Sequence, residues 1–396
     1  TDNKEAYELA VHFGKIIFPY IIFISLAAHF ASINNVHERF AAGAFAPAIL
    51  NISFILSLFV LTPLLPSAGH ALSYGVLVGG VLQFLYLYWT VLKFYRPRIR
   101  IPILNDKLKK FFSLFLPGVV GSGVIQLNIV IGTIIASFLP VGAISHIYYA
   151  DRLNQLPLAI FGIALGIVLL PNLSKAVKQS DQETTHNIQN RSIEFSLLIS
   201  LPSAIGLFIL AEPIIYILFE RGAFLQEDTF YTARVLGYFA LGLPAYIIIK
   251  VLVSCFFARE DTKTPLYISL VSVISNIVLS LLLIGSMREM GIALATAISA
   301  WINALLLYLL LFTRGFLKFD SLLIRNSIKI LLSSALLIFG IFGLKGILFD
   351  DFSANSILTN SLSLFLMIFL VLIIYLGLVI VLKVLTINQL KQYLKK

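Results

Sequence analysis

The stretch YYADRLNQLPLAIFGIALGIVLLP, residues 148–171, decides the fold. It is long enough to cross a bilayer as a helix, which takes about 20 mostly apolar residues, yet it contains Asp151 and Arg152. A charge at the bilayer centre costs about 2.5–3.5 kcal/mol on insertion scales, so something must compensate for it. Two interpretations are open: an ion pair that locks two helices together, or an Arg152 that faces a water-filled cavity and holds an anionic substrate.

The composition of the whole chain gives its class. Hydrophobic residues make up 59% and charged residues only 12%, and the mean hydropathy is +0.96, which excludes a soluble globular domain. The apolar runs are too long for the strands of a membrane β-barrel. The single Cys255 lies inside such a run, and the six histidines are scattered without the spacing of metal ligands. We therefore expect an all-α, polytopic membrane protein.

The apolar runs predict about eleven transmembrane helices. Their expected positions are residues 14–32, 45–64, 71–92, 111–138, 143–171, 193–219, 235–257, 265–285, 290–312, 327–348 and 358–382. The fourth and fifth are long enough to require a tilt or a bend.

The loops between these spans differ in basic charge. Of the 29 lysines and arginines, 21 lie on one set of loop sides and six on the other, and Arg152 and Lys250 lie inside spans. The positive-inside rule makes the first set cytoplasmic, so the N-terminal end is expected outside and the C-terminal end inside. The net charge of +10 is thus mostly a signal of topology, and we expect no nucleic acid as a partner.

The most basic loop, residues 94–110, is interpreted as a connector between two helical lobes. A weak internal sequence repeat agrees with an arrangement in two lobes. FPYIIFI around Pro19 is similar to LPAYIII around Pro244, and an Asn-Ile pair follows each proline at the same separation.

Helix breakers mark one span in particular. LPGVVGSGVIQLN places Pro117, Gly118, Gly121 and Gly123 within about two turns, so this helix is expected to kink. Broken helices serve as hinges or binding sites in transporters. The small residues are equally consistent with close helix packing alone.

Other polar groups inside spans have two interpretations each. Lys250 lies about two turns before the cytoplasmic end of its span, so its ammonium group either snorkels to the interface or lines a cavity. Asn51, Asn128, Asn154, Gln155 and Asn276 suit hydrogen bonds between helices.

Four segments together resemble the MurJ (MviN) family of bacterial lipid II flippases. They are FPYIIFISLAAHFASINNVHERFAAGAFAPAILNIS (residues 18–53), YYADRLNQLPLAIFGIALGIVLLPNLSK (148–175), LFERGAFLQEDTFYTARVLGYFALGLPAYIIIKVL (218–252) and FFAREDTKTP (256–265). They occur in the expected order, and the ADRL segment is the most specific.

The resemblance implies an architecture like that of the MOP superfamily. Two six-helix lobes would face each other across a cationic cavity, followed by two extra helices that form a lipid-accommodating groove. In this chain, residues 1–104 would be the remainder of the first lobe, 105–315 the second lobe and 316–396 the extra pair. Matched in this way, the chain begins just before the fourth helix of the family, so about three helices and further cavity arginines would precede it.

The resemblance also assigns roles to residues. Arg152 would bind the pyrophosphate of lipid II by charge-assisted hydrogen bonds, with Asp151 to orient it and Lys250 as a second cavity cation. The sodium site of some members falls on Gly132, Asn276, Ser280, Ile292 (through its carbonyl) and Thr296. Because Gly132 and Ser280 lack the carboxylates that such members carry, the match argues against sodium here.

We therefore expect a transporter, and not an enzyme, that flips undecaprenyl-pyrophosphate-linked lipid II across the bacterial cytoplasmic membrane by alternating access. Membrane lipids are the other expected partners. No cofactor is indicated, and a monovalent cation and the membrane potential are both open as energy sources. The alternatives are a polysaccharide-lipid flippase or multidrug exporter of the same superfamily, and an integral-membrane glycosyltransferase. The last is disfavoured because the outer loops offer only the acidic pairs 227–228 and 350–351.

Overall fold

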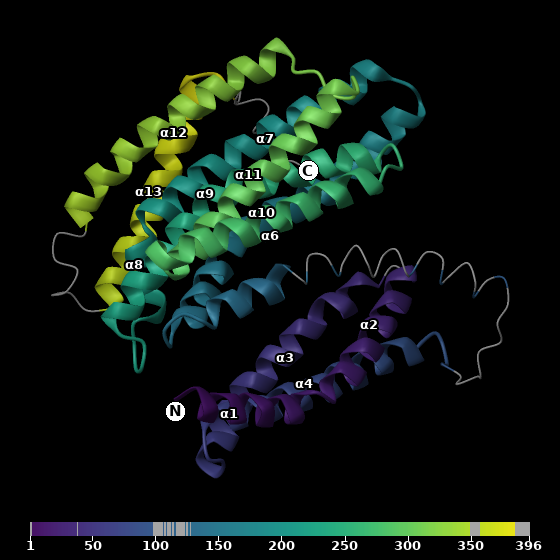
Figure 1. The fold of residues 1–396 in the computed structure, drawn as a ribbon. Coiled ribbons are helices and arrows are strands. Elements are labelled where there is room, and N and C mark those ends of the chain that lie inside the picture. Colours follow the sequence, from purple (N-terminus) through teal and green to yellow (C-terminus); the bar gives the residue numbers. More distant parts are fainter. Residues whose placement is uncertain are drawn as a thin grey trace. The chain divides into compact units, whose positions relative to one another are not determined.

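The computed structural model describes residues 2–37, 39–97, 128–348 and 357–384, and in addition Asp106, Leu108, Phe112, Phe115, Gly123 and Gln126. Every regular element in these residues is a helix (Figure 1). Eight of the described helices are long and apolar enough to cross a membrane, or nine if one bent pair counts as a single span. The predicted class, an all-α polytopic membrane protein, is confirmed. The chain divides into two compact units, residues 1–108 and 109–396, each with its own core.

The first unit contains α1 (Asp2–Ile17), α2 (Tyr20–Val36), α3 (Phe40–Leu61), the short 3-10 helix η1 (Thr62–Leu64) and α4 (Ala68–Leu92). The chain bends by 43° between α1 and α2, where Pro19 cannot continue the hydrogen-bond ladder. Small residues let α3 and α4 approach closely. A Cβ added to Gly75 would lie 2.3 Å from Ser57 Oγ, and the hydroxyl of Ser53 donates to the carbonyl of Gly75 at 2.8 Å.

The second unit contains the described helical residues 128–136, α6 (Ala143–Lys178), α7 (Gln182–Ile209), α8 (Ala211–Phe219), α9 (Gln226–Phe257), α10 (Lys263–Met287), α11 (Glu289–Thr313), α12 (Ser321–Leu348) and α13 (Ile357–Val381). Its central helix is α9, which contacts α6, α7, α8, α10 and α11. The core formed around α9 includes Leu243, Ile247 and Phe256.

The predicted span over residues 193–219 is two helices in the structure. α7 ends at Ile209, and α8 begins at Ala211. Pro213 lies in the first turn of α8, where a proline is tolerated because its missing N–H has no partner in the helix. The proline therefore marks the beginning of a new helix there.

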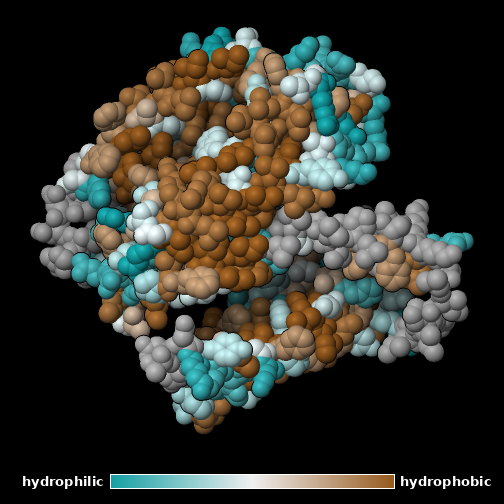
Figure 2. Space-filling model, in the orientation of Figure 1, coloured by the Kyte–Doolittle hydropathy of each residue, from teal (hydrophilic) through white to brown (hydrophobic). Residues whose placement is uncertain are grey.

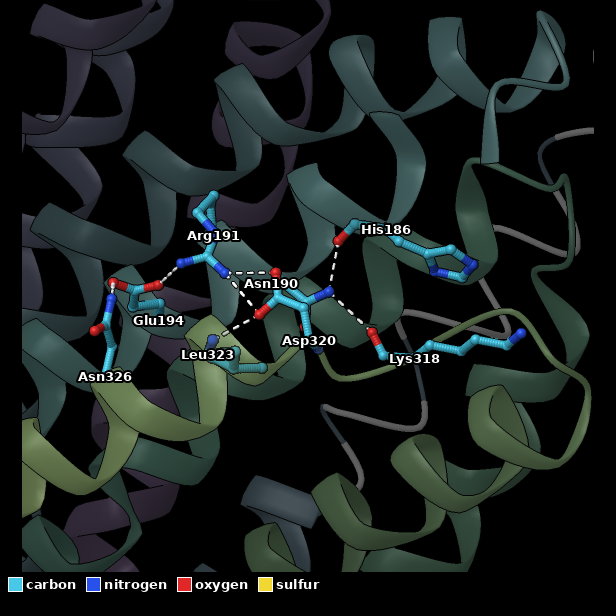
Figure 3. A network of polar contacts seen from close by, with 8 residues as sticks. All are labelled: His186, Asn190, Arg191, Glu194, Lys318, Asp320, Leu323 and Asn326. Atoms are coloured by element: carbon cyan, nitrogen blue, oxygen red, sulfur yellow. Dashed lines mark hydrogen bonds and ion pairs between the residues drawn. The ribbon is translucent and has the colours of Figure 1, made fainter. Parts of the chain in front are cut away.

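A polar network joins α7 to the beginning of α12 (Figure 3). The guanidinium group of Arg191 donates to both carboxylate oxygens of Asp320, at 2.8 and 2.7 Å, and also binds Glu194. Asn326 donates to the second oxygen of Glu194 at 2.5 Å. Asp320 in turn accepts from the N–H of Leu323 at 2.6 Å, as an N-terminal cap does. These contacts fix the beginning of α12 to α7.

The surface agrees with a membrane setting. In Figure 2 hydrophobic residues cover the middle of the helices of residues 143–313, and hydrophilic residues gather towards their two ends. An apolar belt between polar ends is what a bilayer selects.

Candidate functional site

Helix α6 positions the two charges on which the sequence analysis focused. Ala150 and Leu153 are buried, while Asp151 is half-buried and Arg152 is exposed. Asp151 accepts a hydrogen bond from Gln155, one turn further along the same helix. Both partners therefore come from α6, so this contact orients the Asp151 carboxylate without joining α6 to another helix.

Arg152 is held by an aromatic neighbour. Its Nη2 donates to the hydroxyl of Tyr148 at 3.0 Å, and its guanidinium carbon lies 4.7 Å from the centre of the Tyr148 ring. Both contacts again lie within α6, so within the described part of the chain Arg152 does not form the ion pair between helices that was one interpretation of this sequence. A cation–π contact leaves the edge of the guanidinium free to donate to an anion.

A cavity of about 440 Å³ lies beside Asp151. Its walls come from α6, α9 and α11, and its lining residues are Asp151, Asn154, Gln155, Leu158, Ala159, Phe239, Tyr246, Lys250 and Thr296. The side-chain oxygen of Asn154 and the hydroxyl of Tyr246 are buried and have no hydrogen-bond partner among the residues that the structure describes. Buried polar atoms are normally paired, so these two are available to a ligand or to water.

Lys250 belongs to this cavity. It shares the lining with Asp151, which is the geometry expected of the cavity-lining interpretation. The cavity thus presents one cation, one anion, two amides and two hydroxyls, a set that can hold a polar, charged headgroup. Arg152 lies outside the lining, next to Asp151 in the chain.

Four of the five residues matched to a sodium site, all but Gly132, are joined in a hydrogen-bonded cluster. The Asn276 amide donates to Asn128 Oδ1 at 3.0 Å, and its oxygen accepts from Ser280 at 3.2 Å and from Thr296 at 3.5 Å. Thr296 also contacts the carbonyl of Ile292 at 2.8 Å. The oxygens of this cluster are engaged with each other, and no carboxylate is among them.

Gly132 adds nothing to that cluster. A Cβ placed on it would meet no atom within 4 Å, and glycine has no side-chain ligand to offer. A hard cation prefers charged oxygen ligands, so these residues do not fit a bound sodium ion. Among the described residues, no group of three or more His, Cys, Asp or Glu side chains is arranged to hold a metal ion.

Most of the predicted hinge, Pro117, Gly118 and Gly121, lies outside the described residues. Gly123 is described and is helical, and an added Cβ there would meet no atom of the described residues within 4 Å.

An apolar groove of about 370 Å³ runs between α7 and α13. Its lining includes Leu198, Pro202 and Gly206 of α7 and Val371, Tyr375 and Val379 of α13, and the hydroxyl of Tyr375 donates to the carbonyl of Leu198 at 2.7 Å. The groove has the chemistry that suits a hydrocarbon chain.

Sequence reasoning missed Tyr246 as a cavity residue. It lies one helical turn before Lys250, so the i, i+4 spacing along α9 places the two side chains on one face. That spacing could have identified it once Lys250 was suspected. Thr296 was matched only to the sodium site, whereas in the structure it also lines the cavity.

Comparisons with known proteins agree on one family. The family model described as "Lipid II flippase MurJ" matches residues 1–368. A probable lipid II flippase MurJ of Rhizobium tropici is 40% identical over 343 residues, which are 85% of this chain and 64% of that protein. One of Rickettsia prowazekii is 42% identical over 310 residues, 77% of this chain and 60% of that protein. The chain thus spans less than two thirds of the length of these relatives.

Two solved structures share the fold of this chain. A structure of lipid II flippase MurJ in an inward closed conformation has a TM-score of 0.76 and 29% identity, and covers 92% of this chain and 72% of that one. An inward-facing multidrug resistance MATE family transporter of the MOP superfamily has a TM-score of 0.68, with 78% of this chain and 72% of that one covered. Its 14% identity shows a shared fold alone. The chain belongs to the MurJ family of lipid II flippases.

Proposed function

We propose that this protein flips lipid II, the undecaprenyl-pyrophosphate-linked precursor of peptidoglycan, from the inner to the outer leaflet of the bacterial cytoplasmic membrane by alternating access. The observation that carries the proposal is the cavity lined by Asp151 and Lys250 next to Arg152, in a chain 40% identical to a probable lipid II flippase. Flipping moves a molecule without changing its bonds, so no catalytic residue is required.

Arg152 binds the pyrophosphate in this proposal. Its planar guanidinium can form two parallel hydrogen bonds to phosphate oxygens, and Tyr148 holds it in place from the same helix. Lys250 supplies a second positive charge inside the cavity. Asp151, held by Gln155, limits the net charge of the site, so that the bound headgroup can leave again.

The lipid tail would occupy the groove between α7 and α13. Its lining is almost entirely apolar, and burial of each CH₂ group there is worth about 0.8 kcal/mol. In this arrangement residues 316–396 serve the hydrocarbon part of the substrate and α6 and α9 serve its headgroup. The Pro117–Gly123 segment remains the predicted hinge. Because the uncharged Asn276 cluster does not fit a sodium ion, we propose the membrane potential as the energy source.

The test is complementation of a bacterium depleted of its lipid II flippase. Two forms are compared, this chain alone and this chain extended by the N-terminal helices that the sequence match predicts. The rescuing form is then tested with Arg152→Ala, Arg152→Lys and, as a matched control, Arg325→Ala, since Arg325 is exposed on α12. We expect rescue to be lost with Arg152→Ala, partly kept with Arg152→Lys and unchanged with Arg325→Ala at equal expression.

One result would contradict the proposed substrate, and another would contradict the role of Arg152. Failure of both forms to rescue, at confirmed membrane expression, would favour a related lipid or drug substrate of the same superfamily. Full rescue by Arg152→Ala would remove Arg152 from the site while leaving the substrate assignment intact.

A further inference from the structure

The N-terminal ends of three helices, which the positive-inside rule places on the outer side, meet in a partly buried ionic cluster. His146 lies in the first turn of α6, Asp228 in the first turn of α9, and Glu289 is the first residue of α11. The side chain of His146 is 7% exposed and that of Glu289 is fully buried. Positions 146, 228 and 289 are far apart in the sequence, so only the fold brings them together.

Both ring nitrogens of His146 contact a carboxylate. Nδ1 lies 3.0 Å from Glu289 Oε1, and Nε2 lies 2.9 Å from Asp228 Oδ1. A neutral imidazole has only one N–H, so it can donate to one acid and not to both. The imidazolium form donates from both nitrogens and satisfies both contacts at once.

The other contacts of the two acids favour their ionised forms. The second oxygen of Asp228 accepts from the backbone N–H of Leu225 at 2.7 Å, and Glu289 Oε2 lies 3.5 Å from Arg288 Nε. Each acid also lies at the N-terminus of a helix, where the helix dipole stabilises negative charge. Two carboxylates and Arg288 balance in charge only when His146 carries a proton.

Three further features surround the His146 ring: Tyr231 of α9, the chain that precedes α6, and Gly142. From α9, Tyr231 stacks on His146 at 5.7 Å between ring centres and accepts a hydrogen bond from Arg288 at 2.9 Å. The chain before α6, residues 129–142, has no titratable side chain. Gly142 has a φ of +102°, and a Cβ there would lie 3.3 Å from His146 Cε1, so this glycine makes room for the ring.

The cluster does not have the form of a metal site. The two carboxylates approach opposite edges of the imidazole, one at Nδ1 and one at Nε2. They cannot converge with one ring nitrogen on a common ion, and both ring nitrogens of His146 already have a hydrogen-bond partner. The ligand that fits between the two acids is a proton on His146.

The same three helices line the candidate cavity. α6 provides Asp151, five residues after His146, α9 provides Lys250, and α11 provides Thr296. A bond between the outer ends of α6, α9 and α11 therefore fixes the walls of the cavity relative to one another.

We propose that His146, Asp228 and Glu289 form a proton-binding site on the outer side, in which the proton on His146 ties together the three helices that line the cavity. When His146 loses this proton, one of its two contacts becomes a lone pair facing a carboxylate, and the link between α6 and that helix is lost. The site gives the protein a response to external pH that does not depend on which lipid it carries.

The direct test is NMR of the protein labelled with ¹⁵N in its histidine rings. The six histidines give separate ring signals, and the signal that disappears in His146→Gln belongs to His146. An ordinary histidine has a pKa of about 6.5 and is neutral at pH 8. We expect His146 to show the shifts of an imidazolium at pH 8, and a neutral tautomer at pH 7 would overturn the proposal.

A second measurement tests the link between the helices. The thermal unfolding midpoint of the purified protein is followed from pH 6 to pH 9 for the parent, for Asp228→Asn, and for the control His29→Gln, whose site is on α2. We expect the midpoint of the parent and of the control to fall as the pH rises from about 6.5, where an unfolded histidine loses its proton, to the pH at which folded His146 loses its own. In Asp228→Asn, which leaves His146 only one acid, the fall should begin at the same pH but end at a lower pH and be smaller. The same profile in all three proteins would refute a coupling between the proton and the fold.

Discussion

Replacing Arg191 with methionine removes the centre of the network that fixes α12 to α7 (Figure 3). Methionine keeps much of the aliphatic length, so the main loss is polar. Asp320 loses its cationic partner, and Glu194 keeps only the amide of Asn326. The substitution therefore isolates the contribution of one guanidinium to the attachment of residues 316–396.

The expected loss of stability follows from how exposed the side chains of Asp320 and Glu194 are. The side chain of Asp320 is 41% exposed, and an exposed ion pair is worth at most about 1 kcal/mol. The side chain of Glu194 is 12% exposed, and a buried group that loses its partner costs about 1–3 kcal/mol. We expect Arg191→Met to lower the free energy of unfolding by about 2–3 kcal/mol. At roughly 2–4 °C per kcal/mol, the unfolding midpoint falls by about 4–12 °C.

The assay is thermal unfolding in detergent, with Arg325→Met as a control of the same chemistry on the exposed face of α12. The double variant Arg191→Met with Glu194→Gln removes the stranded charge as well. We expect it to be more stable than the sum of the two single changes predicts, because the two residues are in contact. Strict additivity, or a shift no larger than that of Arg325→Met, would refute the account of this network.

Two further predictions concern the loops and the tight turn of the second unit. Partial burial raises the pKa of Asp261, but hydrogen bonds from Thr264 and Arg314 outweigh it and hold that pKa below its ordinary value. Its stabilisation is therefore present above about pH 4 and is lost as the pH falls through the lower, folded-state pKa. Asp261→Asn should unfold at a lower temperature than the parent at pH 7, with a smaller difference at pH 3; an equal difference at both would contradict this. A Cβ on Gly291 would lie 2.8 Å from the backbone oxygen of Leu283, so Gly291→Ala should cost about 1–3 kcal/mol, whereas Gly285→Ala, where nothing lies within 4 Å, should be neutral or stabilising in the same unfolding assay.

The sequence predicted the membrane fold well because hydropathy reports a local property. Each apolar run must satisfy its own backbone as a helix, whatever its neighbours are. The predicted run at residues 265–285, for example, lies inside α10 with only two more residues at each end. The run at 143–171 was too short because α6 continues to Lys178, where Leu173 and Ala176 are buried among polar neighbours. The polar neighbours lower the mean hydropathy of this amphipathic turn, so a prediction from hydropathy ends the helix too early.

The candidate site was predictable only in part. Asp151 and Lys250 were identified because a charge in an apolar run is conspicuous, and the structure places both at one cavity. That Arg152 is held by Tyr148, one turn earlier, could have been inferred from helical spacing. The partners of His146, Asp228 and Glu289, could not be inferred from the sequence. They lie 82 and 143 residues away, and their contacts depend on how α6, α9 and α11 pack. The roles of Arg152, Asp151 and Lys250 remain predictions that the transport assay tests.

The length of α6 has a consequence for the bilayers that can house this protein. Its 36 residues extend about 54 Å, whereas the hydrocarbon core is about 30 Å thick. Even a tilt of about 40° leaves a projection of about 41 Å. Because the last turns carry Lys175 and Lys178, α6 can slide by a turn when the membrane thickens or thins and still keep its apolar run covered. The spans of 25 residues, α4, α10, α11 and α13, have no such reserve, so hydrophobic matching at these shorter helices limits the range of lipid chain lengths more than α6 does.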